Sequence, residues 1–210
     1  MKLVDKSCAE FTQVLSSKAA VPGGGGAAAL VGGLGTALAG MVCNLTIGKK
    51  KYAEYEEEVK EILRKTEEVQ ENFLKMVDKD AENFLPLSKA YGMPTNTEEE
   101  KKEKARVLEE GLKTACEIPI QIVKTSYEAI KLHEALVDKG SKLAISDVGV
   151  GVQCLRAALI SGQLNVIINI SMIKDQEYVA KVKEETEKLV KEGTEIADIV
   201  YKKVEEILSK

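Results

Sequence analysis

The chain has 210 residues and a formal net charge of −4, with 44% apolar and 30% charged residues. A chain of this length buries enough surface to fold without disulfides, and its interleaved charges form no basic field for nucleic acid. The four cysteines form no CxxC pair and stand apart from the only histidine, His133, so the spacing indicates neither a metal site nor a disulfide framework. Such scattered thiols, with an N-terminus that lacks the apolar core of a signal peptide, predict a cytoplasmic protein without a membrane anchor.

All predicted elements are helices, and no linker or repeat divides them, so we expect one all-α domain over residues 1–210. Apolar spacing predicts, in chain order, helices over 5–17, from Gly25 or Gly26 onward, 52–84, 97–118, 119–136, 146–159, 165–173 and 175–208.

Prolines and capping residues set the expected boundaries of these helices. Pro86 should weaken or end the third helix, and Pro119 should break or kink the chain near residue 118. Thr97, and later Ser146 with Asp147, are residue types that favour helix N-caps.

An uncharged segment covers residues 19–48, and more than half of the sixteen glycines lie between Gly23 and Gly48. Glycine is unfavourable inside a helix, so this density suits close approach of the backbone to a ligand, to another helix or to a second subunit. The segment is long enough to span a bilayer, but Gly and Ala gain little in lipid. We therefore expect a helix buried at the centre of a bundle, with Gly32 and Gly40 in close helix contacts.

The glycine run itself, Gly23, Gly24, Gly25 and Gly26, is followed by three alanines, not by the Lys-Ser/Thr of a phosphate loop. No strand precedes it, which argues against a dinucleotide fingerprint. Two interpretations remain: the N–H groups of a helix start could bind a flat or anionic ligand, or the glycines could serve only helix packing.

Asp80 lies at helical spacing from Met76 and Phe84, which belong to an apolar stripe. A carboxylate on or near an apolar face is costly unless it is paired or functional. Asp80 is therefore either a rim residue of the stripe or a candidate acid/base group.

Other polar residues allow two interpretations each. The amides Asn165 and Asn169 could bond between helices or recognise a polar heterocycle. The run Lys49, Lys50, Lys51 and Tyr52 could be a solvated charge cluster or a site that attracts an anion. His133 is predicted to be a surface residue because it lies in a charged stretch.

Five segments stand in order along the chain: Pro22–Ala29, Asn44–Tyr52, Asp80–Phe84, Ser146–Asp147 and Asn165–Asn169. Together they resemble the formiminotetrahydrofolate cyclodeaminase / methenyltetrahydrofolate cyclohydrolase family. The resemblance covers nearly the whole chain and is to the stand-alone bacterial form. The resemblance implies an all-helical homodimer that binds a tetrahydrofolate derivative, with or without a polyglutamate tail, in a cleft. It implies no cofactor beyond that substrate.

Carried over residue by residue, the resemblance assigns the catalytic role to Asp80. It implies substrate binding by Gly23, Gly24, Gly25, Gly26, Lys49, Lys50, Lys51, Tyr52, Asp147, Asn165 and Asn169. The family usually has Pro-Gly-Gly-Gly-Ser where this chain has Gly26 in place of the serine.

The resemblance leads us to expect conversion of 5-formimino-tetrahydrofolate to 5,10-methenyl-tetrahydrofolate with loss of ammonia. The alternatives are hydrolysis of 5,10-methenyl- to 10-formyl-tetrahydrofolate, or a helical oligomer without catalytic activity. Both reactions move a proton near the N5–N10 bridge, which a carboxyl group can supply or accept.

Overall fold

The computed structural model describes residues 2–210, and within this range it contains helices and no strand. Six α-helices follow one another: α1 (Cys8–Leu15), α2 (Gly24–Asn44), α3 (Glu56–Tyr91), α4 (Glu98–Leu136), α5 (Ile145–Ile170) and α6 (Gln176–Leu208). Short 3-10 helices precede α3 (η1, Lys50–Tyr55) and α5 (η2, Lys142–Ala144). The all-α prediction is confirmed.

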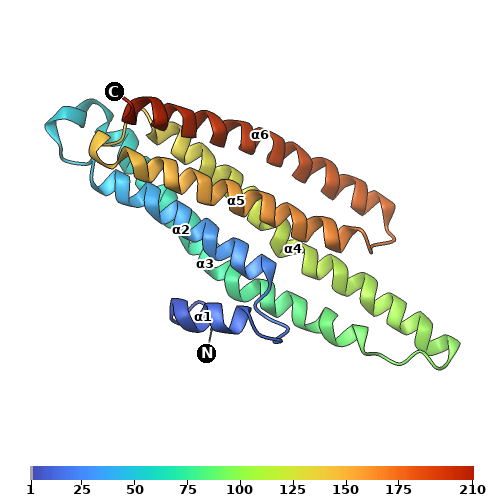
Figure 1. The fold of residues 1–210 in the computed structure, drawn as a ribbon. Coiled ribbons are helices and arrows are strands. Elements are labelled where there is room, and N and C mark those ends of the chain that lie inside the picture. Colours follow the sequence, from blue (N-terminus) through green and yellow to red (C-terminus); the bar gives the residue numbers. More distant parts are fainter. Residues whose placement is uncertain (1) are drawn as a thin grey trace.

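Four long helices form the core of the bundle (Figure 1). α2 packs against α3 and α5, and α4 packs against the same two helices from the other side. α6 covers α4 and α5. α1 lies on the opposite side of the bundle, beside α3. The α3–α4 hairpin extends past the start of α2 (Figure 1).

Glycines allow α2 to approach its neighbours closely. A side chain at Gly32 would overlap the Phe73 ring of α3, and a Cβ atom at Gly35 would lie 2.8 Å from the Gly151 carbonyl oxygen of α5. The predicted close contact is thus present at Gly32. It is absent at Gly40, whose Cβ atom would stand 3.7 Å from Thr66 Oγ1, an ordinary van der Waals distance.

α2 is buried on the side that faces α3 and α5 and exposed on the other. Leu34 keeps 58% of its surface exposed, and Met41 keeps 40%. The helix is therefore not enclosed on all sides by this one chain, in contrast to the central position expected from the sequence.

Pro86 and Pro119 lie inside continuous helices, so the helix ends predicted at these two prolines were wrong. A proline costs one backbone hydrogen bond, but the helix persists where tertiary packing holds both of its sides. Leu87 follows Pro86 into the core, and Ile118 and Pro119 are themselves buried.

Helix caps agree with the prediction at one position and differ at another. Thr97 caps α4, and its Oγ1 accepts a hydrogen bond from the Glu100 N–H at 3.2 Å. Ser146 and Asp147 instead lie inside the first turn of α5, because η2 shifts the helix start to Ile145. α5 is also one continuous helix rather than the two shorter helices that were expected.

His133 is fully buried, so the prediction of a surface histidine was wrong. Its Nε2 lies 3.1 Å from the Gly35 carbonyl oxygen, and Gly151 leaves room for the ring because a side chain there would overlap it. Burial lowers the pKa of His133 to about 4, so the imidazole is neutral near pH 7. It therefore joins α4 to the crossing of α2 and α5.

Candidate active site

Asp80 lies on the inner side of α3, where Met76 and Val77 enter the core, and its carboxylate faces the first turn of α2. A side chain at Gly25 would overlap both carboxylate oxygens and Cγ of Asp80. Only glycine lets the backbone of α2 come this close to the carboxylate. The contact explains why position 25 in the first turn of α2 is a glycine.

Two effects act on the pKa of Asp80. Burial among apolar neighbours disfavours the charged form and raises the pKa above its ordinary value. The backbone N–H of Gly26 donates a hydrogen bond to the carboxylate, which lowers the pKa. Burial is the larger effect. The carboxyl group can therefore exchange a proton closer to neutral pH than an exposed aspartate can.

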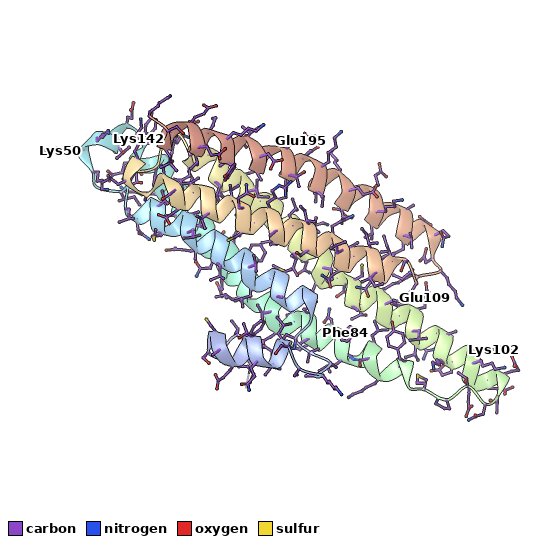
Figure 2. The ribbon with its side chains drawn as sticks, viewed as in Figure 1. Lys50, Phe84, Lys102, Glu109, Lys142 and Glu195 are labelled. Carbon is purple, nitrogen blue, oxygen red and sulfur yellow. The ribbon has the colours of Figure 1, made fainter. Side chains whose placement is uncertain are left out.

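A cavity of about 320 Å³ opens beside Asp80 between the start of α2, the second half of α3, the middle of α4 and the end of α5. Figure 2 shows Phe84 on the part of α3 that passes the start of α2. Most of the wall is apolar, with Asp80 as the one carboxyl group among the lining residues. The lining includes Val21, Gly23, Gly24, Gly25, Phe84, Leu87, Tyr91, Pro119, Asn165, Ile168, Asn169 and Met172.

The two amides of α5 reach the same cavity. Each donates one hydrogen bond within its own helix, Asn165 to the Ser161 carbonyl and Asn169 to the Asn165 carbonyl, both at 2.8 Å. Their amide oxygens remain available to a ligand. Asn165 also lies against Gly24, where an added Cβ atom would be 3.4 Å from the amide.

The start of α2 has no side-chain cap: Gly23 occupies the N-cap position and offers none. N–H groups in the first turn of a helix lack helical partners and carry partial positive charge. The cavity thus combines a carboxyl group of raised pKa, two amides and a helix N-terminus on apolar walls. This set suits a polar heterocycle whose reaction moves a proton.

The remaining predicted site residues lie at the opposite end of the bundle. Lys49 Nζ donates to Ser141 Oγ at 3.1 Å, and the Tyr52 hydroxyl accepts the Lys142 N–H at 2.9 Å. Lys51 Nζ stands 5.7 Å from the centre of the Tyr52 ring. We call residues 49–52 the lysine cluster.

The lysine cluster and the cavity are far apart within one chain. Figure 2 shows Lys50 and Lys142 together at one end, distant from Phe84. Asp147 belongs to the lysine end, and a rise of 1.5 Å per residue puts it about 27 Å along α5 from Asn165. The predicted site residues therefore form two groups.

Sequence reasoning missed most of the apolar wall. Tyr91 stands at the mouth of the cavity and points its hydroxyl at the Met172 sulfur, 3.8 Å away. Both residues lie at helix ends, where apolar periodicity gives no signal. Only the meeting of α3 with the end of α5 brings them together.

No cysteine competes with Asp80 as the reactive group. Burial raises the pKa of the Cys43 thiol to about 12 and that of Cys116 to about 11, so neither forms a thiolate near neutral pH. Cys8 and Cys154 are not among the residues that line the cavity. Thiol nucleophiles are thus excluded from this site.

Comparison with known proteins identifies the class of enzyme. Residues 7–188 match the family described as "Formiminotransferase-cyclodeaminase". The chain is 41% identical to the methenyltetrahydrofolate cyclohydrolase of Methylorubrum extorquens, over 92% of this chain and 93% of that protein. It is 28% identical to the formimidoyltransferase-cyclodeaminase of Mus musculus, over 97% of this chain and 38% of the longer mouse protein.

The fold agrees with these sequence relatives. The crystal structure of formiminotetrahydrofolate cyclodeaminase from Thermotoga maritima superimposes with a TM-score of 0.81 at 26% identity, over 99% of this chain and 98% of the other. The protein is an all-helical enzyme of folate one-carbon metabolism. It belongs to the formiminotransferase-cyclodeaminase family, which confirms the resemblance and removes the alternative of an oligomer without catalytic activity.

Proposed function

We propose that the protein is a methenyltetrahydrofolate cyclohydrolase that converts 5,10-methenyl- to 10-formyl-tetrahydrofolate. The observation that carries this proposal is the Asp80 carboxyl group, held against the start of α2 in an apolar cavity. The reaction is chosen because the cyclohydrolase of M. extorquens is 41% identical from end to end, whereas the cyclodeaminases compared above are 26% and 28% identical.

In this reaction the Asp80 carboxylate accepts a proton from water as the water oxygen bonds to the cationic carbon between N5 and N10. The negative charge also stabilises the cation before addition. The bond from this carbon to N5 then breaks, Asp80 returns its proton to N5, and the hydroxyl proton is released as the formyl group forms on N10. One water is consumed, and one proton leaves in total.

The other groups of the cavity orient the substrate. We assign the amide oxygens of Asn165 and Asn169 to the N–H groups of the pterin ring, and the first turn of α2 to its carbonyl oxygen. The chemistry requires neither an electron carrier nor a metal, so tetrahydrofolate is the only organic partner we propose. We also place the enzyme in the cytoplasm, as a homodimer.

Ammonia loss from 5-formimino-tetrahydrofolate is the second candidate, and the T. maritima structure favours it. The same cavity fits that reaction if Asp80 protonates the departing nitrogen after N10 attacks the formimino carbon. This is the reaction that the resemblance of the sequence led us to expect first. The higher identity of the cyclohydrolase relative reverses the order.

An absorbance assay of the purified protein decides between the two reactions, because only the methenyl form carries the conjugated bridge. A cyclohydrolase accelerates the loss of this absorbance from 5,10-methenyl-tetrahydrofolate above the rate without enzyme. A cyclodeaminase produces the absorbance from 5-formimino-tetrahydrofolate and releases ammonia in equal amount. Activity on neither substrate would contradict the proposal.

A further inference from the structure

Two prolines lie in the interiors of long helices, Pro86 in α3 and Pro119 in α4. A proline has no N–H group, so it cannot donate to the carbonyl four residues earlier, and its ring crowds that carbonyl. The carbonyl oxygens that lose their helical donors are therefore those of Glu82 and Ala115. The surroundings of these two oxygens differ.

The first proline lies on the solvent-exposed side of α3. Glu82 and Pro86 are both exposed, and neither lines the cavity beside Asp80. Solvent can hydrate a carbonyl oxygen at such a position, so the missing helical donor is replaced at little cost.

The second proline belongs to the wall of the cavity. Ala115 is 5% exposed, Pro119 is buried, and both residues line the cavity on its α4 side. Because a helical carbonyl points along the axis toward the residue four positions later, the Ala115 oxygen lies between these two lining residues. No side chain of residues 2–210 replaces the missing donor: Asn83 Nδ2, which reaches this turn of α4, bonds to the Thr114 carbonyl at 3.0 Å.

A buried carbonyl without a donor is unfavourable, because no hydrogen bond compensates for its loss of water. Any residue with an N–H group at position 119 would remove this cost, and alanine would also favour the helix. The chain has proline there instead, in the wall of a cavity. This arrangement suits a ligand that brings the donor with it.

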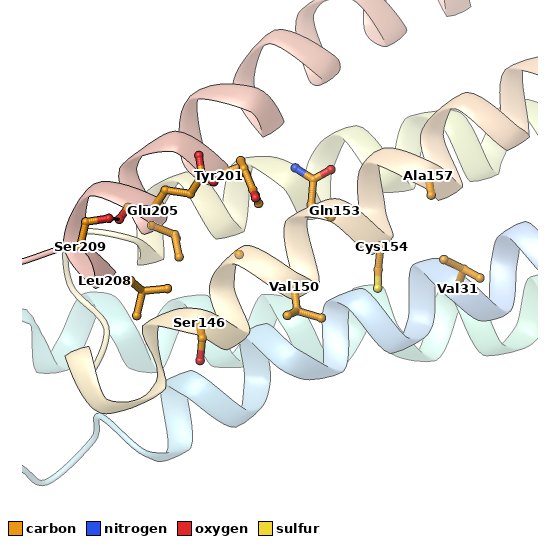
Figure 3. A pocket seen from close by; sticks show the side chains of 12 residues that line it. Val31, Ser146, Val150, Gln153, Cys154, Ala157, Tyr201, Glu205, Leu208 and Ser209 are labelled. Carbon is orange, nitrogen blue, oxygen red and sulfur yellow. Dashed lines mark hydrogen bonds between the residues drawn. The ribbon is translucent and has the colours of Figure 1, made fainter.

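The size of a hollow does not by itself mark such a wall. A larger hollow, of about 780 Å³, lies between α5 and the end of α6, and Figure 3 shows Val31, Cys154 and Tyr201 among its lining residues. None of its lining residues is followed by a proline four positions later. The freed carbonyl therefore distinguishes the smaller cavity beside Asp80.

A reduced pterin ring carries a matching donor. Its C4 carbonyl and N5 lie along one long edge, and N1 and the N8–H group lie along the opposite edge. In the proposed reaction N5 meets Asp80 and the C4 carbonyl meets the first turn of α2, and these two protein groups are in contact at Gly25. Since α4 packs on α3 and α5 from the side opposite α2, the edge that carries N8–H faces α4.

We propose that the Ala115 carbonyl, freed by Pro119, accepts a hydrogen bond from the N8–H group of the substrate's pterin ring, an assignment that rests on the proposed function because that function supplies the pterin. The amide oxygens of Asn165 and Asn169 then bind N3–H and the 2-amino group. Each ring nitrogen that carries hydrogen thus has an acceptor.

This contact makes the enzyme sensitive to the oxidation state of the ring. Tetrahydro- and 7,8-dihydropterins carry hydrogen on N8, whereas N8 of the fully oxidised ring is itself an acceptor. A carbonyl oxygen that faces this acceptor forms no hydrogen bond with it. A site built to bond a ligand N–H rejects the analogue that lacks it, because the buried acceptor is left unpaired.

Two folates isolate the contact in a binding experiment. 7,8-Dihydrofolate and folate share the imine at N5 and differ at the C7–N8 bond, so only the first has hydrogen on N8. Isothermal titration calorimetry gives the Kd of each. The wild-type protein should bind dihydrofolate about tenfold more tightly, the usual effect of one hydrogen bond to a buried acceptor.

Pro119→Ala supplies the missing N–H group and engages the Ala115 carbonyl within the helix. The Kd ratio should then fall to within about twofold of one, and the KM for 5,10-methenyl-tetrahydrofolate should rise about tenfold while kcat changes by less than about twofold. Pro119→Val also supplies the N–H group and fills more of the volume of the ring, so it repeats the test if the alanine variant is poorly folded. Circular dichroism and Tm establish that each variant is folded.

Pro86→Ala is the matched control, because it restores a helical donor to the Glu82 carbonyl outside the cavity. Its Kd ratio and KM should stay within about twofold of the wild type. Equal Kd values in the wild type, a wild-type ratio retained in folded Pro119 variants, or the same loss in Pro86→Ala would each overturn the proposal. Wild-type turnover of methenyl-tetrahydrofolate is measured separately: its absence would refute the proposed reaction, whereas the Kd ratio reports on the Ala115 contact without it.

Discussion

α2 and α5 are held in the bundle differently from α3, α4 and α6. The first two carry almost no charge and rely on close backbone contacts, such as Gly35 against the Gly151 carbonyl oxygen. The other three are amphipathic and carry many ion pairs one turn apart, each worth only a few tenths of a kcal/mol. The charged helices can therefore change on their surface at little cost, whereas α2 and α5 cannot gain a side chain at their closest contacts, such as Gly32, Gly35 and Gly151, without a clash.

The cavity lies where these two kinds of helix meet. Asp80 comes from the charged helix α3, and it touches the glycine start of α2 beside the amides of α5. The pKa of its carboxyl group is raised because the uncharged neighbours bury it. We therefore expect turnover to fall when either side of this contact is changed, whether Asp80 of α3 or the residues that touch it at the start of α2.

The largest expected effect is that of Asp80→Asn. The variant keeps the shape of the side chain but cannot exchange the proton, so kcat should fall by about 10²–10⁴-fold, the usual loss of a general acid or base. Steady-state kinetics with methenyl-tetrahydrofolate measures this. Glu82→Gln, an exposed change on the same helix, should leave kcat within about twofold. Near-normal turnover of folded Asp80→Asn would remove Asp80 from the mechanism.

Next in size is the cost of filling a close contact in α2. Gly32→Ala forces a methyl group into the Phe73 ring and should lower the free energy of unfolding by about 1–3 kcal/mol. Gly40→Ala has ordinary space around it and should be neutral or stabilising by up to about 1 kcal/mol, since alanine favours helix. Urea unfolding of the pair checks both. Equal destabilisation would show that α2 does not depend on these contacts.

Sequence reasoning predicted the helices better than their ends. Apolar spacing predicted helix over every long element, because each buries one stripe, but it divided α4 and α5 into two helices each. It placed breaks at Pro86 and Pro119, where packing on both sides keeps the helix intact, and it missed η2, which moves the start of α5. Tertiary contact decided these boundaries, and a single sequence does not display it.

The candidate site was predicted in its polar part only. Asp80, the glycine run and the two amides could be singled out because polar or flexible residues stood in apolar surroundings. His133 stood in a charged stretch and was assigned to the surface, although its ring fills the space that Gly151 leaves and lies beside the Gly35 carbonyl oxygen. The distance between the lysine cluster and Asp80 also required the structure, because it depends on helix direction rather than on motif order.

The raised pKa of Asp80 makes a smaller prediction about pH. A carboxyl group whose folded-state pKa is raised contributes stability below its ordinary pKa, and this contribution is lost as the pH rises through the raised value. Asp80→Asn should therefore raise Tm at pH 7 relative to the wild type, and the difference should shrink below pH 4. Calorimetry at both pH values measures it. An unchanged or lower Tm at pH 7 would mean that burial does not strain the ionised form.

The smallest expected effect concerns Gly26, where the family usually has serine. A Cβ atom there would lie 3.5 Å from the Val77 carbonyl oxygen and 3.9 Å from Asp80 Oδ2, so Gly26→Ser fits without displacing either neighbour. The new hydroxyl can donate to the Asp80 carboxylate, and a hydrogen bond to the charged form lowers its pKa. The acidic limb of the kcat/KM profile should then move to lower pH, with kcat changed by only about two- to fivefold.

Gly26→Ala is the matched control for this last variant, because it adds the Cβ atom without the hydroxyl. Its pH profile should stay with that of the wild type, whereas the serine variant should shift. Equal shifts in both variants would attribute the effect to displaced water rather than to the hydrogen bond. No shift in either would show that a side chain at position 26 does not affect the carboxylate, and the burial of Asp80 with its backbone hydrogen bond would then account for the pH dependence of the enzyme.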